Sequence, residues 1–166
     1  VRPIKRVLIR GRNPSKAAAI ADEYAERFET HVVEELADAV AEADIISCVT
    51  LSNQPLIKGE WLTPGTHLDL IGAFRPQMRE TDALCLRRSE VFVDTYAGAK
   101  GEAGDILQAI EEGEFQFDQI QAELAEVLAG ARSGRSAPDA ITLFKSVGAS
   151  LEDLAAAIEV WESLLE

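Results

Sequence analysis

Short apolar runs alternate with longer helix-forming segments along nearly the whole chain, and this alternation is the feature that most restricts its fold. The run at residues 44–49 is mostly apolar, and the run at residues 65–72 carries Leu68, Leu70 and Ile71 between two glycines. We expect both to be strands buried on both faces. An alanine-rich segment over residues 14–28 predicts a helix. Buried strands that alternate with helices are typical of a parallel sheet covered by helices on both sides. The sequence therefore predicts an α/β fold with a doubly wound, mostly parallel sheet.

The expected elements share this pattern and are separated by glycine, proline or small polar residues. Strands are predicted at residues 6–10, 30–33, 44–49, 65–72, 91–94 and 140–145. Helices are predicted at residues 14–28, 34–43, 105–112, 122–128 and 150–165. Asn13 before Pro14 is typical of an N-cap followed by the first helical position. Residues 130–138 are expected to form a loop, and we find no internal repeat.

Composition excludes several classes of function. The net charge of −13 disfavours nucleic acid and anionic membrane surfaces as partners, because both need Lys and Arg on the protein. The sequence shows neither a signal peptide nor an apolar run of the roughly 20 residues that span a bilayer. Two cysteines and two distant histidines disfavour a disulfide scaffold and a zinc site. We therefore expect a cytoplasmic protein without a metal site.

Four strand ends carry the residues expected to bind a ligand. In doubly wound sheets, ligands bind at the carboxyl ends of the strands. The residues that follow these ends here are small, polar or basic: Gly11, Arg12 and Asn13 with Lys16; Thr50, Leu51 and Ser52; Gly72 and Ala73; and Lys145, Ser146 and Gly148. We expect these residues to contact a dinucleotide cofactor.

The basic pair Arg12 and Lys16 bears on which cofactor is bound. In a dinucleotide fold, an acidic residue at the end of the second strand holds the ribose hydroxyls, and an arginine there favours the extra phosphate of NADP. The acidic residue is absent here, so the expectation is NADP(H), with NAD(H) as the alternative. Taken alone, the two basic side chains are also compatible with an ordinary solvated loop.

An ordered set of short segments resembles the ornithine cyclodeaminase and mu-crystallin family. They share small, proline-containing or polar patterns at strand ends: residues 43–46, 50–52 with Pro55, 59–62, 64–67, 71–73, Arg75-Pro76 with Arg79-Glu80, Glu102 with Gly104-Asp105, and 142–148 followed by Glu152-Asp153. The last segment is the most diagnostic. The resemblance runs in the family's order from about Val7 to the C-terminus.

The resemblance implies a Rossmann-type cofactor domain beside a second domain that dimerises and holds the substrate. Val7 would lie in the family's second strand, and no G-x-G-x-x-G occurs in the sequence. Residues 1–166 are therefore expected to form one partial dinucleotide-binding domain, incomplete at its N-terminal strand and glycine-rich turn. Residues 149–166 would form a closing helix against the missing domain. We expect such a chain to be inactive alone. It should either self-associate through unpaired edges of the strands around Leu8 and Ile46 or be one visible part of a longer polypeptide.

The resemblance also narrows the reaction. Cyclodeaminases of the family carry a catalytic aspartate shortly after the strand at residues 65–72, and here that position is Phe74. Phenylalanine cannot transfer a proton. This favours an NAD(P)H-dependent reductase acting on a cyclic imino acid such as Δ1-pyrroline-2-carboxylate, with a homodimer as the intact enzyme and no catalytic residue assigned in this chain. The alternatives are an ornithine cyclodeaminase and a non-catalytic mu-crystallin-like binder of cofactor or ligand.

Two further interpretations concern two pairs of residues. Asp94 and Asp105 are expected to act as strand-end and helix-capping groups. Trp61 and Trp161 are expected to be packing anchors rather than residues that stack on a substrate.

Overall fold

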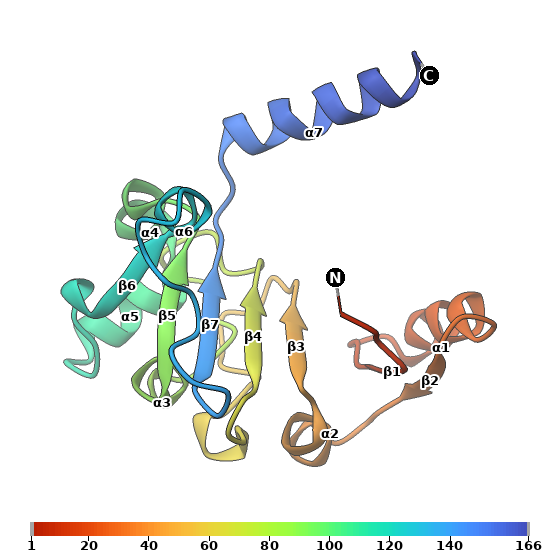
Figure 1. The fold of residues 1–166 in the computed structure, drawn as a ribbon. Helices are drawn as coiled ribbons and strands as arrows, with labels where there is room; N and C mark the ends of the chain where they lie inside the picture. The colour runs from red at the N-terminus through yellow and green to blue at the C-terminus, as the bar shows by residue number, and fades with distance from the viewer. Residues whose placement is uncertain (1, 166) are drawn as a thin grey trace. The chain divides into compact units, whose positions relative to one another are not determined.

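The computed structural model describes residues 2–165 and divides the chain into two compact units, with the boundary between Glu42 and Ala43. Each unit is described by itself. The first carries β1 (Arg6–Ile9), α1 (Pro14–Tyr24), β2 (Glu29–Val32) and α2 (Leu36–Glu42). The remaining elements belong to the second unit (Figure 1).

The first unit is built on one parallel strand pair. β1 and β2 run side by side, with Leu8 opposite His31. α1 begins as the sequence predicts, because Asn13 Oδ1 accepts a hydrogen bond from Lys16 N at 3.2 Å and Pro14 occupies the first turn. The buried apolar side chains of this unit, within the described residues, are Ala17, Ala21 and Val40. The strand pair therefore rests on a small core.

The second unit is a five-stranded parallel sheet with helices in the connections between its strands and one helix, α7, after the last strand. Its strands are β3 (Ile45–Cys48), β4 (His67–Leu70), β5 (Ser89–Val93), β6 (Ile120–Glu123) and β7 (Ile141–Lys145). Its helices are η1 (Gly59–Trp61), α3 (Ala83–Arg88), α4 (Tyr96–Glu102), α5 (Gly104–Glu111), η2 (Phe117–Gln119), α6 (Leu124–Leu128) and α7 (Ser150–Ser163). The spatial order of the strands is β3-β4-β7-β5-β6, and their arrows point the same way in Figure 1.

The core of the second unit lies between the central strands and the helices. Leu70, Val91 and Leu143 on the sheet are fully buried, as are Leu86 on α3 and Ile106 on α5. Side chains of this size contribute about 1.5–3 kcal/mol each when buried. The predicted α/β fold with parallel strands is confirmed.

Several details differ from the sequence-based expectation. α3, α4 and β6 were not predicted. The predicted helix at residues 122–128 starts at Leu124 instead, because Ala122 and Glu123 pair with β5 as part of β6. β3 is less buried than its apolar run predicts, with Ile45 43% exposed, because β3 pairs only with β4 within the described residues.

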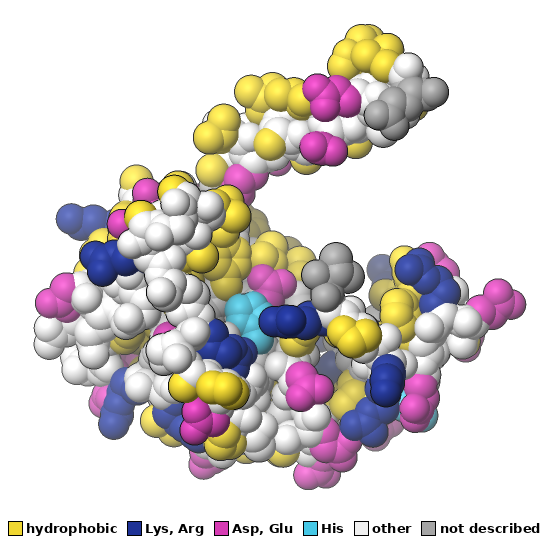
Figure 2. Space-filling view, in the orientation of Figure 1, with side chains coloured by type: hydrophobic (Ala, Val, Ile, Leu, Met, Phe, Trp, Pro, Cys, Tyr) yellow, Lys and Arg dark blue, Asp and Glu magenta, His cyan; other side chains and the backbone are white. Residues whose placement is uncertain are grey.

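α7 follows the carboxyl end of β7, and the residues described in it are all exposed (Figure 1). Four of its large apolar side chains recur at intervals of three and four residues: Leu151, Leu154, Ile158 and Trp161. Figure 2 shows hydrophobic side chains along this helix. Trp161 is 64% exposed, so within the described residues this side chain does not act as a packing anchor, and its packing on another part of the protein stays a prediction. No helix within residues 2–165 is both long and apolar enough to cross a membrane.

Candidate functional site

The carboxyl ends of β3, β4 and β7 lie next to one another in the sheet. Ile71 N donates to Cys48 O at 2.9 Å, and Ser146 N donates to Leu70 O at 3.0 Å. Because the strands are parallel, the segments that follow them share one edge. The structure thus brings together three of the four predicted groups, which begin at Thr50, Gly72 and Lys145.

Glu80 holds the loop after β3 in place. Its Oε1 accepts hydrogen bonds from Thr50 N at 2.6 Å and from Thr50 Oγ1 at 2.7 Å. Leu51 is 63% exposed. Ser52 Oγ donates to Gln54 O at 2.7 Å, which tightens the turn. The loop therefore has a fixed base at Thr50 and an accessible apolar side chain at Leu51.

The segment after β4 is closely packed. A Cβ added to Gly72 would lie 2.1 Å from Glu80 Oε1 and 2.2 Å from the carbonyl oxygen of Thr50, so no larger residue fits without movement. Ala73 is fully buried, and its carbonyl accepts a hydrogen bond from Gly104 N at 3.2 Å. The glycine at this strand end is thus accounted for by contacts within the protein.

Lys145, at the end of β7, is fully buried. Its Nζ donates to the carbonyl oxygens of Leu70 at 3.3 Å and Gly72 at 3.4 Å, and it lies 3.5 Å from Asp105 Oδ2. The ammonium group of Lys145 therefore holds the backbone at the end of β4 in place through these carbonyl oxygens. Any contribution of Lys145 to cofactor binding would therefore act through the backbone that it holds.

The segment after β7 is organised by Asp94. Its Oδ2 accepts hydrogen bonds from Ser146 Oγ at 3.1 Å, Val147 N at 2.7 Å and Gly148 N at 2.8 Å. Gly148 has φ +88°, a conformation that glycine adopts without steric cost, and is exposed. Asp94 is thus a strand-end group, as the sequence predicts, and it also fixes the chain that leads into α7.

The predicted residues of the first unit form a separate basic group. Arg12 and Lys16 are exposed beside the first turn of α1, which contains no acidic residue. The guanidinium of Arg10 donates to Glu34 O at 3.2 Å and also contacts Gly11 O. A helix N-terminus with two exposed cations and no acidic residue in its first turn suits a phosphate group. These residues therefore fit the phosphate-bearing adenosine end of a dinucleotide.

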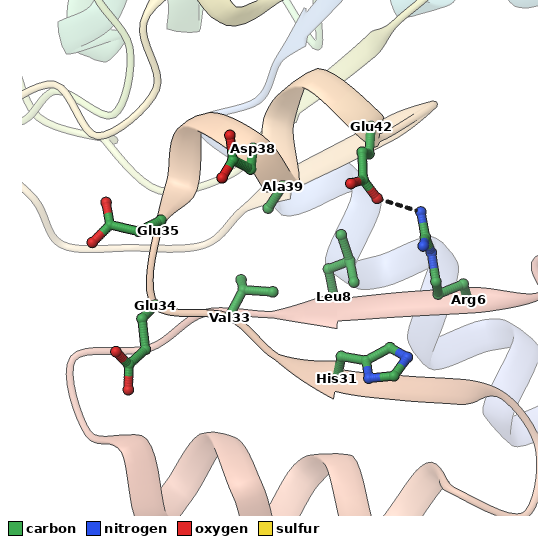
Figure 3. A pocket seen from close by; sticks show the side chains of 9 residues that line it. All are labelled: Arg6, Leu8, His31, Val33, Glu34, Glu35, Asp38, Ala39 and Glu42. Carbon is green, nitrogen blue, oxygen red and sulfur yellow. Dashed lines mark hydrogen bonds and ion pairs between the residues drawn. The ribbon is translucent and has the colours of Figure 1, made fainter.

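One pocket, of about 420 Å³, lies within the first unit (Figure 3). Acidic side chains dominate its lining through Glu34, Glu35, Asp38 and Glu42, and Arg6 is engaged by Glu42 at 2.7 Å. The predicted site residues do not line it. Because phosphates are anionic, this pocket is a poor place for the phosphates of a dinucleotide.

The edge offers little acid–base chemistry of its own. Burial raises the pKa of the Cys48 thiol to about 12, so Cys48 is a thiol rather than a nucleophilic thiolate at neutral pH. Phe74 is half-buried, with the Arg75 guanidinium 5.7 Å from its ring centroid. This arrangement is suited to holding a molecule that carries its own reactive group.

Sequence reasoning missed Glu80 as a structural centre and gave Asp105 only a helix-capping role. Asp105 does lie in the first turn of α5, but its Oδ1 accepts from Glu80 N, Thr81 N and Thr81 Oγ1 at 2.8–3.0 Å. The local sequence carries no signal of burial, since Glu80 lies between the polar residues Arg79 and Thr81 and Asp105 follows Gly104. Their burial depends on partners 24–40 residues away, which a local pattern does not reveal.

The sequence matches the ornithine cyclodeaminase/mu-crystallin family over residues 1–166. It is 37% identical to a Δ1-pyrroline-2-carboxylate reductase of Colwellia psychrerythraea over 171 residues, covering 100% of this chain and 54% of that protein. The resemblance inferred from the motifs is confirmed.

Solved structures agree. The structure of Thermococcus litoralis Δ1-pyrroline-2-carboxylate reductase in complex with NADH and L-proline is similar with a TM-score of 0.94 and 36% identity, covering 99% of this chain and 52% of that one. An archaeal alanine dehydrogenase dimer with bound NAD is similar with a TM-score of 0.90 and 30% identity, covering 99% and 51%. The fold is thus Rossmann-like, and the chain spans about half the length of these relatives.

Proposed function

Because the chain belongs to the ornithine cyclodeaminase/mu-crystallin family, we propose that it is the cofactor-binding part of an NAD(P)H-dependent reductase acting on a cyclic imino acid of the Δ1-pyrroline-2-carboxylate type. The observation that carries the proposal is the joint likeness, in sequence and in fold, to Δ1-pyrroline-2-carboxylate reductases. The product would be the corresponding cyclic amino acid, which suits the L-proline bound in one of these relatives.

The reaction balances with one cofactor and one proton. The bound nicotinamide would supply hydride to the carbon of the C=N bond, while a proton is added to its nitrogen. Thr50, Leu51, Ser52 and the backbone from Gly72 to Ala73 would hold the nicotinamide half against the sheet edge. Phe74 presents no acid or base, which favours reduction over cyclodeamination.

We assign the phosphate-bearing half of the cofactor to Gly11, Arg12, Asn13 and Lys16. Arg12 and Lys16 are exposed, and the N-terminus of α1 adds a partial positive charge. These features favour the 2′-phosphate of NADP(H), whereas the two similar structures hold NADH or NAD. The choice between NADP(H) and NAD(H) is therefore a prediction about this protein.

The activity is assigned to the whole protein that carries this chain. The chain corresponds to one partial dinucleotide-binding domain, and the similar proteins are about twice as long. The apolar side chains of α7 would pack on the other half of the protein, and the intact cytoplasmic enzyme would be a homodimer, as the similar alanine dehydrogenase is. We expect the 166-residue chain alone to be inactive.

The test is an assay of the full-length protein that carries this chain. Purified protein is incubated with NADPH or NADH and Δ1-pyrroline-2-carboxylate, and nucleotide oxidation and proline formation are both measured. A parallel incubation contains ornithine and NAD, with ammonia and proline as the readout. Reduction of the imino acid with little conversion of ornithine supports the proposal.

Two outcomes contradict it. Ornithine turnover comparable to imino-acid reduction would establish a cyclodeaminase. Tight nucleotide binding without turnover of either substrate would favour a non-catalytic binder.

A further inference from the structure

Three titratable side chains lie close to the proposed nicotinamide edge, and all are fully buried: Glu80, Asp105 and Lys145. They come from the segment between β4 and α3, from the first turn of α5 and from the end of β7. Burying an ionised group costs several kcal/mol unless it is paired and hydrogen-bonded. We call this set the buried charge cluster.

Each member of the cluster holds a different piece of backbone. Lys145 Nζ holds the carbonyls of Leu70 and Gly72 at 3.3 and 3.4 Å. Asp105 Oδ1 holds the amides of Glu80 and Thr81, both at 2.8 Å. The cluster thus binds the end of β4 to the segment that precedes α3.

Glu80 extends this network to β3. Its Oε1 accepts from both Thr50 N and Thr50 Oγ1, at 2.6 and 2.7 Å. The same oxygen occupies the space that a Cβ on Gly72 would take, 2.1 Å from that position. One carboxyl oxygen therefore sets how closely Thr50 and Gly72 approach each other.

We propose that Glu80 is a positioning residue for the cofactor: by holding Thr50 against the end of β4, it fixes the loop from Thr50 to Ser52 in the geometry that receives the nicotinamide half. The inference rests on the proposed function, which places the cofactor at this edge. Glu80 itself is fully buried and acts only through Thr50.

The numbers of acidic and basic groups in the cluster bear on how the Glu80 carboxyl can be buried there. Two carboxyl groups face one ammonium group, and Glu80 Oε2 and Asp105 Oδ2 have no hydrogen-bond partner within the described residues. Burial raises the pKa of the Glu80 carboxyl, against the opposing effect of the Thr50 hydrogen bonds. A raised pKa means that this carboxyl holds its proton more readily than an ordinary one, and Gln keeps the acceptor oxygen that contacts Thr50. Gln should therefore replace Glu80 better than Ala does.

The test uses the full-length protein with Glu80→Ala, Glu80→Gln and Thr50→Val. The dissociation constants of NADPH and NADH are measured by nucleotide fluorescence, and KM for the imino acid and kcat are measured separately. Glu80→Ala should weaken nucleotide binding by about tenfold or more, with a much smaller change in the KM of the imino acid. Glu80→Gln should restore most of this loss, and Thr50→Val should shift nucleotide affinity in the same direction as Glu80→Ala.

Hydrogen exchange separates positioning from a general loss of structure. In Glu80→Ala, the Thr50 amide should lose protection while the amides of β7 keep theirs. Glu114→Ala is the matched control, because Glu114 pairs with Arg87 at 2.6 Å on the exposed surface. If Glu80→Ala does not fold, the nucleotide affinities of Glu80→Gln and Thr50→Val test the positioning role.

The outcomes distinguish the two proposals. A wild-type protein that binds neither nucleotide overturns the proposed function, and the positioning role falls with it. A wild-type protein that binds nucleotide, together with folded Glu80→Ala or Thr50→Val that binds it equally well, overturns the positioning role alone. An increase in the KM of the imino acid as large as the loss of nucleotide affinity also overturns the positioning role.

Discussion

Asp94 and Gly148 are joined by a hydrogen bond of 2.8 Å from the Gly148 amide to Asp94 Oδ2, across 54 residues of sequence. The same oxygen accepts from Val147 N, and Asp94 Oδ1 accepts from Thr95 N at 2.6 Å. The carboxylate at the end of β5 therefore determines the path of the chain after β7. This relationship leads to a prediction about stability.

Replacing Asp94 by Ala should destabilise the second unit by about 2–4 kcal/mol, because the amides of Thr95, Val147 and Gly148 lose a charged acceptor. Asp94→Asn keeps one acceptor oxygen and should cost less. Urea unfolding of the 166-residue chain, followed by tryptophan fluorescence and circular dichroism, measures both. Asp118→Ala, at an exposed position, is the control. A loss no greater than that of the control would show that water replaces the carboxylate.

Gly72→Ala should be strongly destabilising, by more than about 2 kcal/mol, because the new methyl group would overlap Glu80 Oε1 and the Thr50 carbonyl. Gly101→Ala is a matched control inside α4, where a Cβ meets nothing within 4 Å. This control should be neutral or stabilising by up to about 1 kcal/mol, since Ala favours helix over Gly. Thermal unfolding of the two variants compares them directly, and equal midpoints would contradict the close packing at Gly72.

Glu80 should give the protein a specific dependence of stability on pH. Burial raises the pKa of its carboxyl above the ordinary value of 4.5, with Asp105 adding to this effect and Lys145 opposing it. The folded state then holds a proton that the unfolded state releases, so this stability is complete below pH 4.5 and declines as pH rises toward the folded pKa. Glu80→Gln should remove this decline in stability, because the amide does not titrate.

The measurement is the free energy of unfolding of wild type and Glu80→Gln between acidic and neutral pH. The difference should shift in favour of the Gln variant as pH increases. A constant difference, or one that shifts toward wild type, would mean that Glu80 is ionised in the folded protein.

Arg12→Ala in the full-length protein should lower the ratio of NADPH to NADH efficiency by about tenfold, because one charge-assisted contact to the 2′-phosphate is lost. Steady-state kcat/KM for both nucleotides is the readout. Arg27→Ala, in the same unit but beyond the end of α1, controls for net charge. A wild-type preference for NADH that survives Arg12→Ala would refute the assignment of the phosphate site.

Much of the fold was predictable because its central strands are apolar runs bounded by glycine or small polar residues. β4 and β7 lie within their predicted ranges for this reason. β6 was missed because Ile120–Glu123 is short and contains two polar residues, and its identity as a strand comes from pairing with β5. α3 and α4 are only 6 and 7 residues long, too short for a clear helical period.

The site was predictable only in its location. The rule that ligands bind at carboxyl ends of strands led to Thr50, Gly72 and Lys145, which the structure places at one edge. Burial could not be predicted in the same way. Lys145 was expected to face the cofactor, but its side chain is enclosed with Asp105, 40 residues earlier. Such a pairing arises from tertiary packing and leaves no local pattern.

The small core around Ala17, Ala21 and Val40 has a consequence for how the chain melts. Cooperativity requires that elements share enough buried apolar surface to lose it together. The strand pair of the first unit buries little, whereas β4, β5 and β7 enclose several large side chains. Heating the isolated chain should therefore produce two calorimetric steps, an early one of small enthalpy for residues 2–42 and a later, larger one for the sheet that carries Lys145. A melting temperature quoted as a single value would describe only the second step.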